Sequence, residues 1–306
     1  MSKKRLLIVT NVDWFFISHR LAIAEEALKQ GYEVIVAAEN TGRANEIEKK
    51  GIRFVNLSFS RSGTNIVDEL STILRFYLLY RKVKPDVVHQ ITLKPVIYGS
   101  IVSRFTSING VVNAISGLGY NFTNSRISST VKWMIQLMRY GFKRKNLSVI
   151  FQNKDDYNEL KGLKILSSQN TIFFIKGSGV NLNEYHSNLL PETSKIKILF
   201  PSRMLWDKGV KEVYEAALEL KKEYYTKIEF ILAGLADENN KAGVPQDILE
   251  SWQDGTYLQW IGYCQNMKKV YEDCHIVILP SYREGMPKSL IEAAAMGRAL
   301  ITTDAI

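Results

Sequence analysis

Cysteine and histidine are scarce in this chain of 306 residues, which has two cysteines, Cys264 and Cys274, and four histidines. The cysteines form no CxxC pair and lie at no metal-ligand spacing from a histidine pair, which argues against a zinc site or a disulfide framework. His275 follows Cys274, but one such neighbour does not make a site. We interpret both cysteines as buried free thiols in a reducing compartment.

Long hydrophobic runs are also lacking. No stretch approaches the roughly 20 apolar residues of a transmembrane helix. After Met-Ser-Lys-Lys-Arg the apolar run Leu6–Thr10 is too short for the core of a signal peptide. Low-complexity segments and short repeats are absent, and a composition of 46% hydrophobic and 23% charged residues is typical of globular domains. We therefore expect a cytoplasmic protein.

Acidic residues are few in the first half of the chain. Residues 1–150 hold 22 Lys and Arg against 10 Asp and Glu, a net charge of +12, whereas residues 151–306 hold 18 against 21, a net charge of −3. The basic half indicates an anionic partner, such as nucleic acid, an acidic membrane face or a phosphate-bearing substrate. A solvated basic surface without a partner is the alternative. Because basic and aromatic residues do not interleave in a known nucleic-acid motif, we expect no nucleic-acid partner.

Short β-rich apolar runs alternate with amphipathic segments along the whole chain. The expected strands are Leu6–Thr10, Glu33–Ala37, Arg53–Leu57, Asp86–His89, Gly110–Ala114, Ser148–Phe151, Thr171–Ile175, Ile196–Phe200, Ile228–Ala233, Tyr257–Ile261, His275–Leu279 and Ala299–Thr302. The expected helices are Ile17–Gln30, Ile66–Lys82, Ser129–Phe142, Lys208–Lys222, Met267–Asp273 and Pro287–Met296. This alternation predicts an α/β fold with parallel sheets covered by helices on both faces.

A polar stretch at residues 181–194 is the best domain boundary. We expect a Rossmann-like domain at residues 1–180 and a second at 195–306, both doubly wound and facing a cleft. In such sheets ligands bind outside the carboxyl ends of the strands. The loops after the expected strands are therefore where chemistry should be sought.

The strongest pattern begins where strand His275–Leu279 ends and runs from Pro280 to Gly297. Pro287 favours the first turn of a helix, whose backbone N–H groups can bind a pyrophosphate. The segment contains Glu284 and, eight positions later, Glu292. The backbone of residues 285–288 would form the phosphate cradle: Gly285, Met286, Pro287 and Lys288. A surface loop before a capped helix is the alternative.

Glu-x7-Glu in the frame EGxPxSxxEAxxxG resembles the retaining family 4 glycosyltransferases of the GT-B fold. The resemblance implies that Glu284 orients the donor sugar and that Glu292 binds the ribose. A second element agrees, because Arg203 and Lys208, followed by Gly209, are similar to the family's R-x4-KG pattern. The resemblance implies that this pair holds the donor diphosphate and stabilises charge on the leaving nucleotide. By themselves the two cations would fit a solvated helix start.

Further residues border the nucleotide pocket if the resemblance holds. Gly234 and Gly262 follow expected strands, and Tyr263 would lie near the base, although either glycine also fits an ordinary turn. No Asp-x-Asp sequence occurs. Because the other common glycosyltransferase fold binds a divalent metal through that motif, we expect no metal and no cofactor besides the nucleotide-sugar co-substrate.

The acceptor side is expected at strand ends of the first domain. Asp13, His19 and Arg20 lie in a segment after the first strand that resembles family members acting on membrane-linked sugars. Many relatives have His-Gly where this chain has Ser116 and Gly117. His89, at the end of strand Asp86–His89, is a candidate to replace the missing histidine in part. The alternative is that His89 is a strand-end residue whose hydrogen bonds are satisfied within the fold.

The segment Ser129–Arg144 mixes aromatic with basic residues, including Trp133, Tyr140, Lys132 and Arg144. Such a helix can lie in a membrane interface. A helix packed on its sheet with basic residues in solvent is the alternative. We expect peripheral contact with an anionic membrane at its inner face.

The resemblance implies transfer of a sugar from a uridine diphosphate donor, with retention, to a lipid-linked or saccharide acceptor in surface polysaccharide synthesis. It is closest to enzymes acting on undecaprenyl carriers. Relatives continue beyond Ile306, so we expect a C-terminally truncated chain with an incomplete second domain. A sugar-nucleotide epimerase and a non-catalytic remnant are the alternatives.

Overall fold

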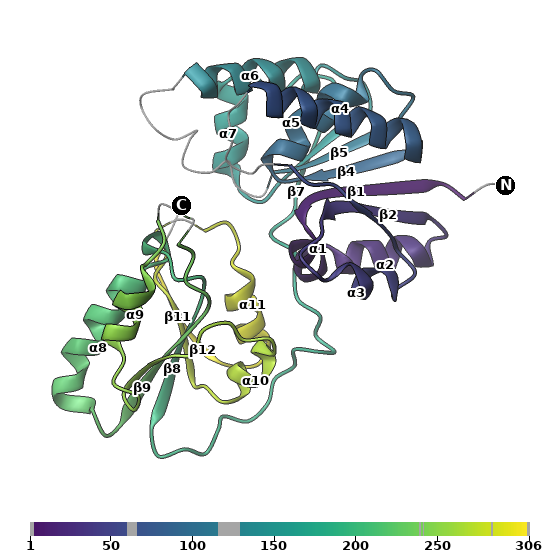
Figure 1. Ribbon diagram of the computed structural model, residues 1–306. Coiled ribbons are helices and arrows are strands. Elements are labelled where there is room, and N and C mark those ends of the chain that lie inside the picture. Colours follow the sequence, from purple (N-terminus) through teal and green to yellow (C-terminus); the bar gives the residue numbers. More distant parts are fainter. Residues whose placement is uncertain are drawn as a thin grey trace. The chain divides into compact units, whose positions relative to one another are not determined.

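The computed structural model describes residues 3–59, 66–115, 129–238, 240, 242–282 and 284–304. The chain forms two compact units, Met1–Ser178 and Gly179–Ile306. Each unit is a parallel sheet with helices on both faces (Figure 1). Both the expected α/β class and the expected Rossmann-like organisation of each half are confirmed.

The N-terminal unit contains a seven-stranded sheet in the order β3-β2-β1-β4-β5-β6-β7, in which every pair of neighbours is parallel. Its strands are β1 (Arg5–Val12), β2 (Glu33–Glu39), β3 (Arg53–Asn56), β4 (Val87–Ile91), β5 (Gly110–Ile115), β6 (Leu147–Phe151) and β7 (Thr171–Phe174). The central strands are buried on both faces and mostly apolar, as burial beneath two helical layers requires.

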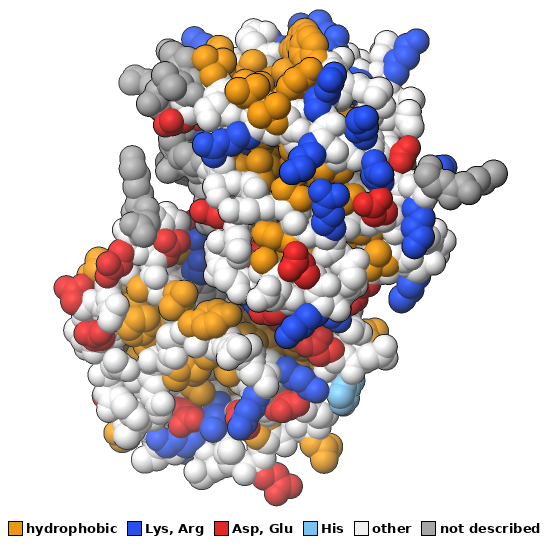
Figure 2. Space-filling view, turned by 45° about the vertical axis from the view of Figure 1, so that its right-hand side comes forward, with side chains coloured by type: hydrophobic (Ala, Val, Ile, Leu, Met, Phe, Trp, Pro, Cys, Tyr) orange, Lys and Arg blue, Asp and Glu red, His pale blue; other side chains and the backbone are white. Residues whose placement is uncertain are grey.

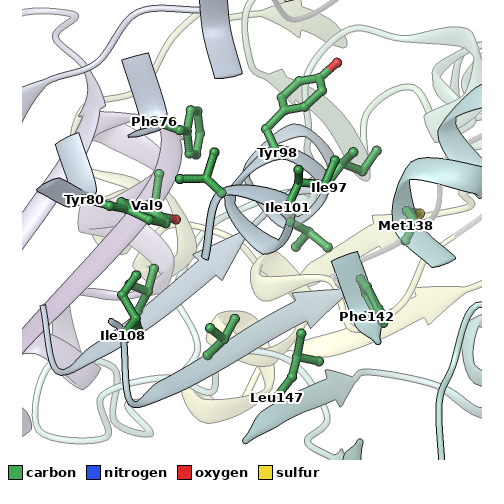
Figure 3. Packing of buried hydrophobic residues seen from close by; sticks show 14 of the residues in the cluster. Val9, Phe76, Tyr80, Ile97, Tyr98, Ile101, Ile108, Met138, Phe142 and Leu147 are labelled. Carbon is green, nitrogen blue, oxygen red and sulfur yellow. The ribbon is translucent and has the colours of Figure 1, made fainter. Parts of the chain in front are cut away.

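Seven helices connect these strands among the described residues. They are α1 (Asp13–His19), α2 (Leu21–Lys29), α3 (Ala44–Glu48), α4 (Ile66–Val83), α5 (Leu93–Ser103), α6 (Ser129–Phe142) and α7 (Lys154–Gly162). One core lies between the sheet and α1 to α3, and a larger core lies beneath α4 to α7. Figure 3 shows the larger core, where Phe76 of α4, Ile97 of α5 and Met138 of α6 pack over the sheet.

The C-terminal unit contains a five-stranded parallel sheet in the order β10-β9-β8-β11-β12. Its elements are β8 (Ile196–Pro201), α8 (Val210–Tyr224), β9 (Ile228–Ala233), α9 (Gln246–Trp252), β10 (Leu258–Trp260), α10 (Met267–Glu272), β11 (Ile276–Leu279), α11 (Lys288–Ala295) and β12 (Ala299–Thr302). A single apolar cluster, including Phe200, Phe230 and Tyr271, fills its interior.

All twelve expected strands are present, but the helices were predicted less completely. Helix α5 was missed because its residues from Pro95 to Ser103 are all buried, so it has no amphipathic stripe. The expected helix Ile17–Gln30 is two helices, α1 and α2, which meet at Arg20.

Both sheets share one topological feature. In the N-terminal unit β1 and β4 are neighbours, and the strands that follow β1 are added on one side of this pair whereas those that follow β4 are added on the other side. In the C-terminal unit β8 and β11 have the same relation. Loops after these neighbouring strands diverge at the carboxyl edge of the sheet and leave a crevice for ligands. The two switch points are therefore the places at which to examine the predicted residues.

Candidate functional site

The loops after β8 and β11 are joined at the switch point of the C-terminal unit. The backbone N–H of Tyr282 donates to the carbonyl of Asp207 at 3.0 Å, and the hydroxyl of Ser281 donates to the same carbonyl at 3.1 Å. These contacts hold the R-x4-KG and Glu-x7-Glu segments together. Because β8 and β11 are adjacent strands, two patterns about 80 residues apart in the sequence lie together at one candidate site.

Lys208 and Glu284 lie in direct contact at this point. The Lys208 ammonium donates a hydrogen bond to Oε1 of Glu284. Their side chains are 21% and 22% exposed, so the pair is partly covered yet accessible from solvent. The pair therefore holds a cation and a carboxylate at the edge of the sheet. A phosphate could replace Glu284 as the partner of Lys208, and a sugar hydroxyl could replace Lys208 as the partner of Glu284.

Arg203 has a different partner from Lys208. Its Nη1 donates to Oδ2 of Asp237, in the loop after β9, at 2.8 Å, and its side chain is about half exposed. The two cations expected to face one phosphate group thus each hold a separate carboxylate. Exposed ion pairs of this kind contribute little to stability, so an anion can displace Asp237 at small cost.

Two glycines permit the close packing of these loops. Gly209 has φ +79°, and a Cβ placed there would lie 2.2 Å from the carbonyl oxygen of Pro280. Gly234 has φ +155°, and its Cβ would lie 1.8 Å from the carbonyl oxygen of Ser202. Any side chain at either position would push the loops apart.

The N-terminus of α11 opens beside the Lys208–Glu284 pair. Pro287 is the N-cap and makes no side-chain cap hydrogen bond, and the first turn contains no acidic residue. The first N–H groups of a helix have no intrahelical acceptors, and the dipole adds partial positive charge there. The predicted segment Gly285–Lys288 therefore leads into a helix N-terminus that is suited to bind an anion.

Glu292 is nearly buried, and its carboxylate is engaged from several sides. Oε2 accepts from the Tyr271 hydroxyl at 3.2 Å, and Oε1 lies 3.1 Å from the ammonium of Lys288. Burial, and then the charge of Glu292, raise the pKa of Tyr271 and also that of Tyr185. The sequence indicated Glu292 but not the two tyrosines, because α10 and the segment before β8 meet α11 only in the fold.

The loop after β10 carries the remaining residues predicted for the nucleotide. The carbonyl of Gly262 accepts from the N–H of Gly234 at 2.7 Å, which ties this loop to the end of β9. Gly262 has φ +63° with open space around it, so its role is that of a turn residue. Tyr263 is 62% exposed and presents its ring to solvent.

Asp13 is fully buried at the end of β1 and holds the loop that follows β2. Its carboxylate accepts from the backbone N–H of Thr41 at 2.7 Å, from that of Arg43 at 2.9 Å and from the Thr41 hydroxyl. Burial opposes ionisation, but these hydrogen bonds hold the pKa of Asp13 below its usual value. The predicted acceptor residue thus shapes the rim of the sheet.

Arg20 and His89 are both buried and are close enough to interact electrostatically. Arg20 is 7% exposed, its Nη1 donates to the carbonyl of His19, and its Nε has no hydrogen-bond partner. No carboxylate of a described residue pairs with it. Burial and then the charge of Arg20 lower the pKa of His89 to about 4. His89 is therefore neutral near pH 7.

His19 is ordered by its neighbours. Its Nδ1 lies 2.6 Å from the hydroxyl of Ser18, and its ring stacks on Phe15 with centroids 4.4 Å apart. Ser116 and Gly117 lie outside the described residues.

Sequence reasoning missed Thr92, which lies at the N-terminal switch point directly after β4. It has φ +71°, a conformation that a β-branched residue rarely adopts, and its hydroxyl donates to Asn11 at 2.6 Å. Two residues later the Lys94 ammonium lies 2.7 Å from buried Glu69, which also accepts from the Tyr98 hydroxyl. Strained backbone at a strand end is typical of ligand sites, but no pattern in the sequence reveals it.

Neither a cluster of metal-binding side chains nor a membrane-spanning helix is found within the described ranges. No group of three or more His, Cys, Asp or Glu side chains there is placed to share a metal ion. In the same part of the chain, no helix combines the length and apolar character needed to cross a membrane.

Comparison with known proteins places both halves of the chain in glycosyltransferase families. Residues 5–153 match the family described as "Glycosyl transferase 4-like", and residues 181–306 match "Glycosyl transferases group 1". A similar protein is the N,N'-diacetylbacillosaminyl-diphospho-undecaprenol alpha-1,3-N-acetylgalactosaminyltransferase of Campylobacter jejuni. It is 26% identical over 94% of this chain and 80% of its own length.

Another relative is the UDP-Gal:alpha-D-GlcNAc-diphosphoundecaprenol alpha-1,3-galactosyltransferase of Escherichia coli, 21% identical over 78% of this chain and 63% of its own length. Among solved structures, a glycosyltransferase from Rickettsia africae has a TM-score of 0.72 with 18% identity, over 100% of this chain and 80% of its own. Anabaena HepE bound to UDP and glucose has a TM-score of 0.73 with 13% identity, over 99% and 81%. These structures share the fold, and with glycosyltransferase families matching both halves, the chain belongs to the family 4 glycosyltransferases of the GT-B fold.

Proposed function

We propose that this glycosyltransferase moves a sugar from a uridine diphosphate donor to a lipid-linked saccharide, with retention of anomeric configuration, in surface polysaccharide synthesis. The observation that carries the proposal is the Lys208–Glu284 contact beside the open N-terminus of α11. The names of two relatives specify diphosphoundecaprenol acceptors, one of them with UDP-galactose, and HepE binds UDP and glucose.

On the donor side, Lys208 and Arg203 bind the diphosphate and the first turn of α11 completes its cradle. Glu284, released from Lys208, accepts hydrogen bonds from the donor sugar, and Glu292 binds the ribose. Tyr263 and Gly262 border the base. Metal ions are not needed in this scheme, because the two cations and the helix N-terminus supply the positive charge.

The chemical step breaks the bond between the anomeric carbon and the β-phosphate oxygen. An acceptor hydroxyl attacks the anomeric carbon from the same face, and its proton passes to the departing phosphate oxygen. Charge grows on that oxygen as the bond breaks, so fixed cations stabilise the transition state more than the ground state. No protein nucleophile is required.

On the acceptor side, Arg20 is suited to a diphosphate because it is a buried guanidinium with no carboxylate partner among the described residues. A buried cation without a counterion is costly, and an anionic ligand removes that cost. His89, neutral beside it, can donate or accept a hydrogen bond without adding charge.

Lys208→Met tests the donor assignment. Loss of one charge-assisted contact should weaken UDP binding about 10- to 100-fold in calorimetry. Loss of transition-state stabilisation should lower kcat about 100- to 1,000-fold. Lys211→Met is the matched control, because Lys211 lies on the next turn, is exposed and pairs with Glu215. Equal UDP affinity and equal kcat in the two variants would remove Lys208 from the site.

The epimerase alternative shares the fold, since a UDP-N-acetylglucosamine 2-epimerase has a TM-score of 0.59 with 13% identity. Product analysis separates the two activities. A transferase releases UDP in proportion to extended acceptor, whereas an epimerase alters the donor sugar without any acceptor.

A further inference from the structure

The outer face of α4 carries an apolar stripe that neither switch point uses. Phe76 and Tyr80 face the core of the N-terminal unit. On the other side Leu70, Leu74 and Leu78 follow one another at four-residue spacing and are 61%, 56% and 57% exposed. Residues four apart lie one above the other on a helix, so these leucines form one continuous row facing away from the sheet. The helix is thus apolar on both faces.

Beyond its first turn, which holds Asp68 and Glu69, the same helix carries cations and no acidic residue. From Leu70 to Lys84 the chain contains no Asp or Glu, but it contains the exposed residues Arg75, Arg81, Lys82 and Lys84. None of these four forms an ion pair with another described residue. Figure 2 shows Lys and Arg side chains gathered over the N-terminal unit beside exposed hydrophobic side chains. The leucine row is therefore flanked by positive charge that forms no ion pair among the described residues.

A basic cavity of about 910 Å³ adjoins the C-terminal end of α4. The end of α4 and the loop between α5 and β5 line it, and they contribute Arg81, Lys84 and Arg104. Its one acidic side chain, Asp86, accepts a hydrogen bond from the backbone N–H of Arg5 at 2.8 Å. Phe105, also part of the lining, is 61% exposed. The cavity thus combines three cations with an apolar edge.

Helix α6 joins this surface through Arg104. The guanidinium lies 4.5 Å from the centre of the Tyr140 ring and donates to the Tyr140 carbonyl at 3.2 Å. Tyr140 and Trp133 are 44% and 50% exposed on α6. The aromatic and basic helix that the sequence indicated is therefore continuous with the cavity, and α4 extends the surface in the other direction.

We infer that the α4 face, defined as Leu70, Leu74, Leu78, Phe105 and the cations Arg75, Arg81, Lys82, Lys84 and Arg104, docks onto an anionic lipid bilayer. The leucines and Phe105 enter the headgroup–acyl boundary, and the cations contact lipid phosphates, one of which occupies the cavity. Charge selects this occupant, because two copies of the face would bring their cations together. The inference deepens the proposed function, since a lipid-linked acceptor resides in a bilayer.

Flotation of the full chain with vesicles tests the inference without donor or acceptor, so its outcome is independent of the transferase activity. The protein should bind phosphatidylcholine vesicles that contain phosphatidylglycerol, and added salt should weaken the binding. Two variants probe the two components. Arg81→Gln with Lys84→Gln should weaken binding about 30-fold, at roughly fivefold per charge. Leu74→Gln with Leu78→Gln should weaken it about tenfold or more, because two leucines lose apolar contact.

The matched control is Leu218→Gln with Leu220→Gln, which replaces two exposed leucines of α8 in the acidic half of the chain. It should bind vesicles like the wild type. Unchanged thermal melting of all three variants verifies folding. Three results would each overturn the inference: wild-type chain that does not float with anionic vesicles, α4 variants that bind like the control, and a wild-type dimer that Leu74→Gln with Leu78→Gln dissociates.

Discussion

Acidification from pH 7 to pH 5 should destabilise the N-terminal unit through His89. This side chain is 6% exposed on β4, and its surroundings lower its pKa from the ordinary 6.5 to about 4. Burial is the main cause, and the charge of Arg20 adds to it. Between these two pKa values the unfolded chain binds a proton that the folded chain does not, so stability falls as pH falls.

The magnitude follows from the difference between the two pKa values. One pKa unit corresponds to about 1.4 kcal/mol, so full protonation would remove about 3 kcal/mol of unfolding free energy. Most of the decline lies between pH 6.5 and pH 4, and the step from pH 7 to pH 5 should remove about 2 kcal/mol. Above pH 7 the effect is absent, because His89 is then neutral in both states.

Urea unfolding followed by two-dimensional NMR would measure this loss, because resonances of the N-terminal unit report its unfolding separately. His89→Gln keeps a polar side chain of similar size but does not titrate. The variant should show about 2 kcal/mol less decline than the wild type between pH 7 and pH 5. Equal pH dependence in both proteins, or a ring titration of His89 near pH 6.5, would refute the reasoning.

Two further substitutions test the packing of the sites. Gly234→Ala should destabilise the C-terminal unit by about 3 kcal/mol in thermal or urea unfolding, because its Cβ would overlap the Ser202 carbonyl. Gly255→Ala, with open space around it, should cost about 1 kcal/mol, and equal costs would contradict the overlap. Asp13→Asn should cost about 1–3 kcal/mol, because an amide cannot accept all the hydrogen bonds that the carboxylate accepts. Exposed Asp155→Asn should be near neutral, and a similar loss there would show that Asp13 has no special role.

Much of the fold was predictable because strands buried on both faces leave a strong signal. Runs such as Ile-Lys-Ile-Leu-Phe before Pro201 fix a strand, and the glycines after strands mark the turns. The convergence of Lys208 and Glu284 also followed, because both segments directly succeed strands of one parallel sheet. That expectation required only that the two strands belong to one sheet. The order of the strands, which places these two next to each other, was not needed for it.

Other features depend on contacts that periodicity does not encode. The partners of Asp13 are backbone N–H groups of a loop about 30 residues away, so the carboxylate looked available for a ligand. The pattern of α4 predicted a helix, but it is apolar on two faces and gave no sign which would be buried. The tyrosines around Glu292 are likewise brought together only in the fold, where α10 and the segment before β8 meet α11.

The central claim is tested most directly by a transfer assay. The full chain would be given a panel of UDP-sugars with a diphosphoundecaprenol-linked saccharide, and products would be followed by mass spectrometry and by NMR of the new anomeric proton. The account predicts that one UDP-sugar is consumed, that UDP appears in equal amount with an acceptor longer by one sugar, and that the anomeric configuration is retained. Consumption of donor without acceptor extension, or an inverted product, would contradict it.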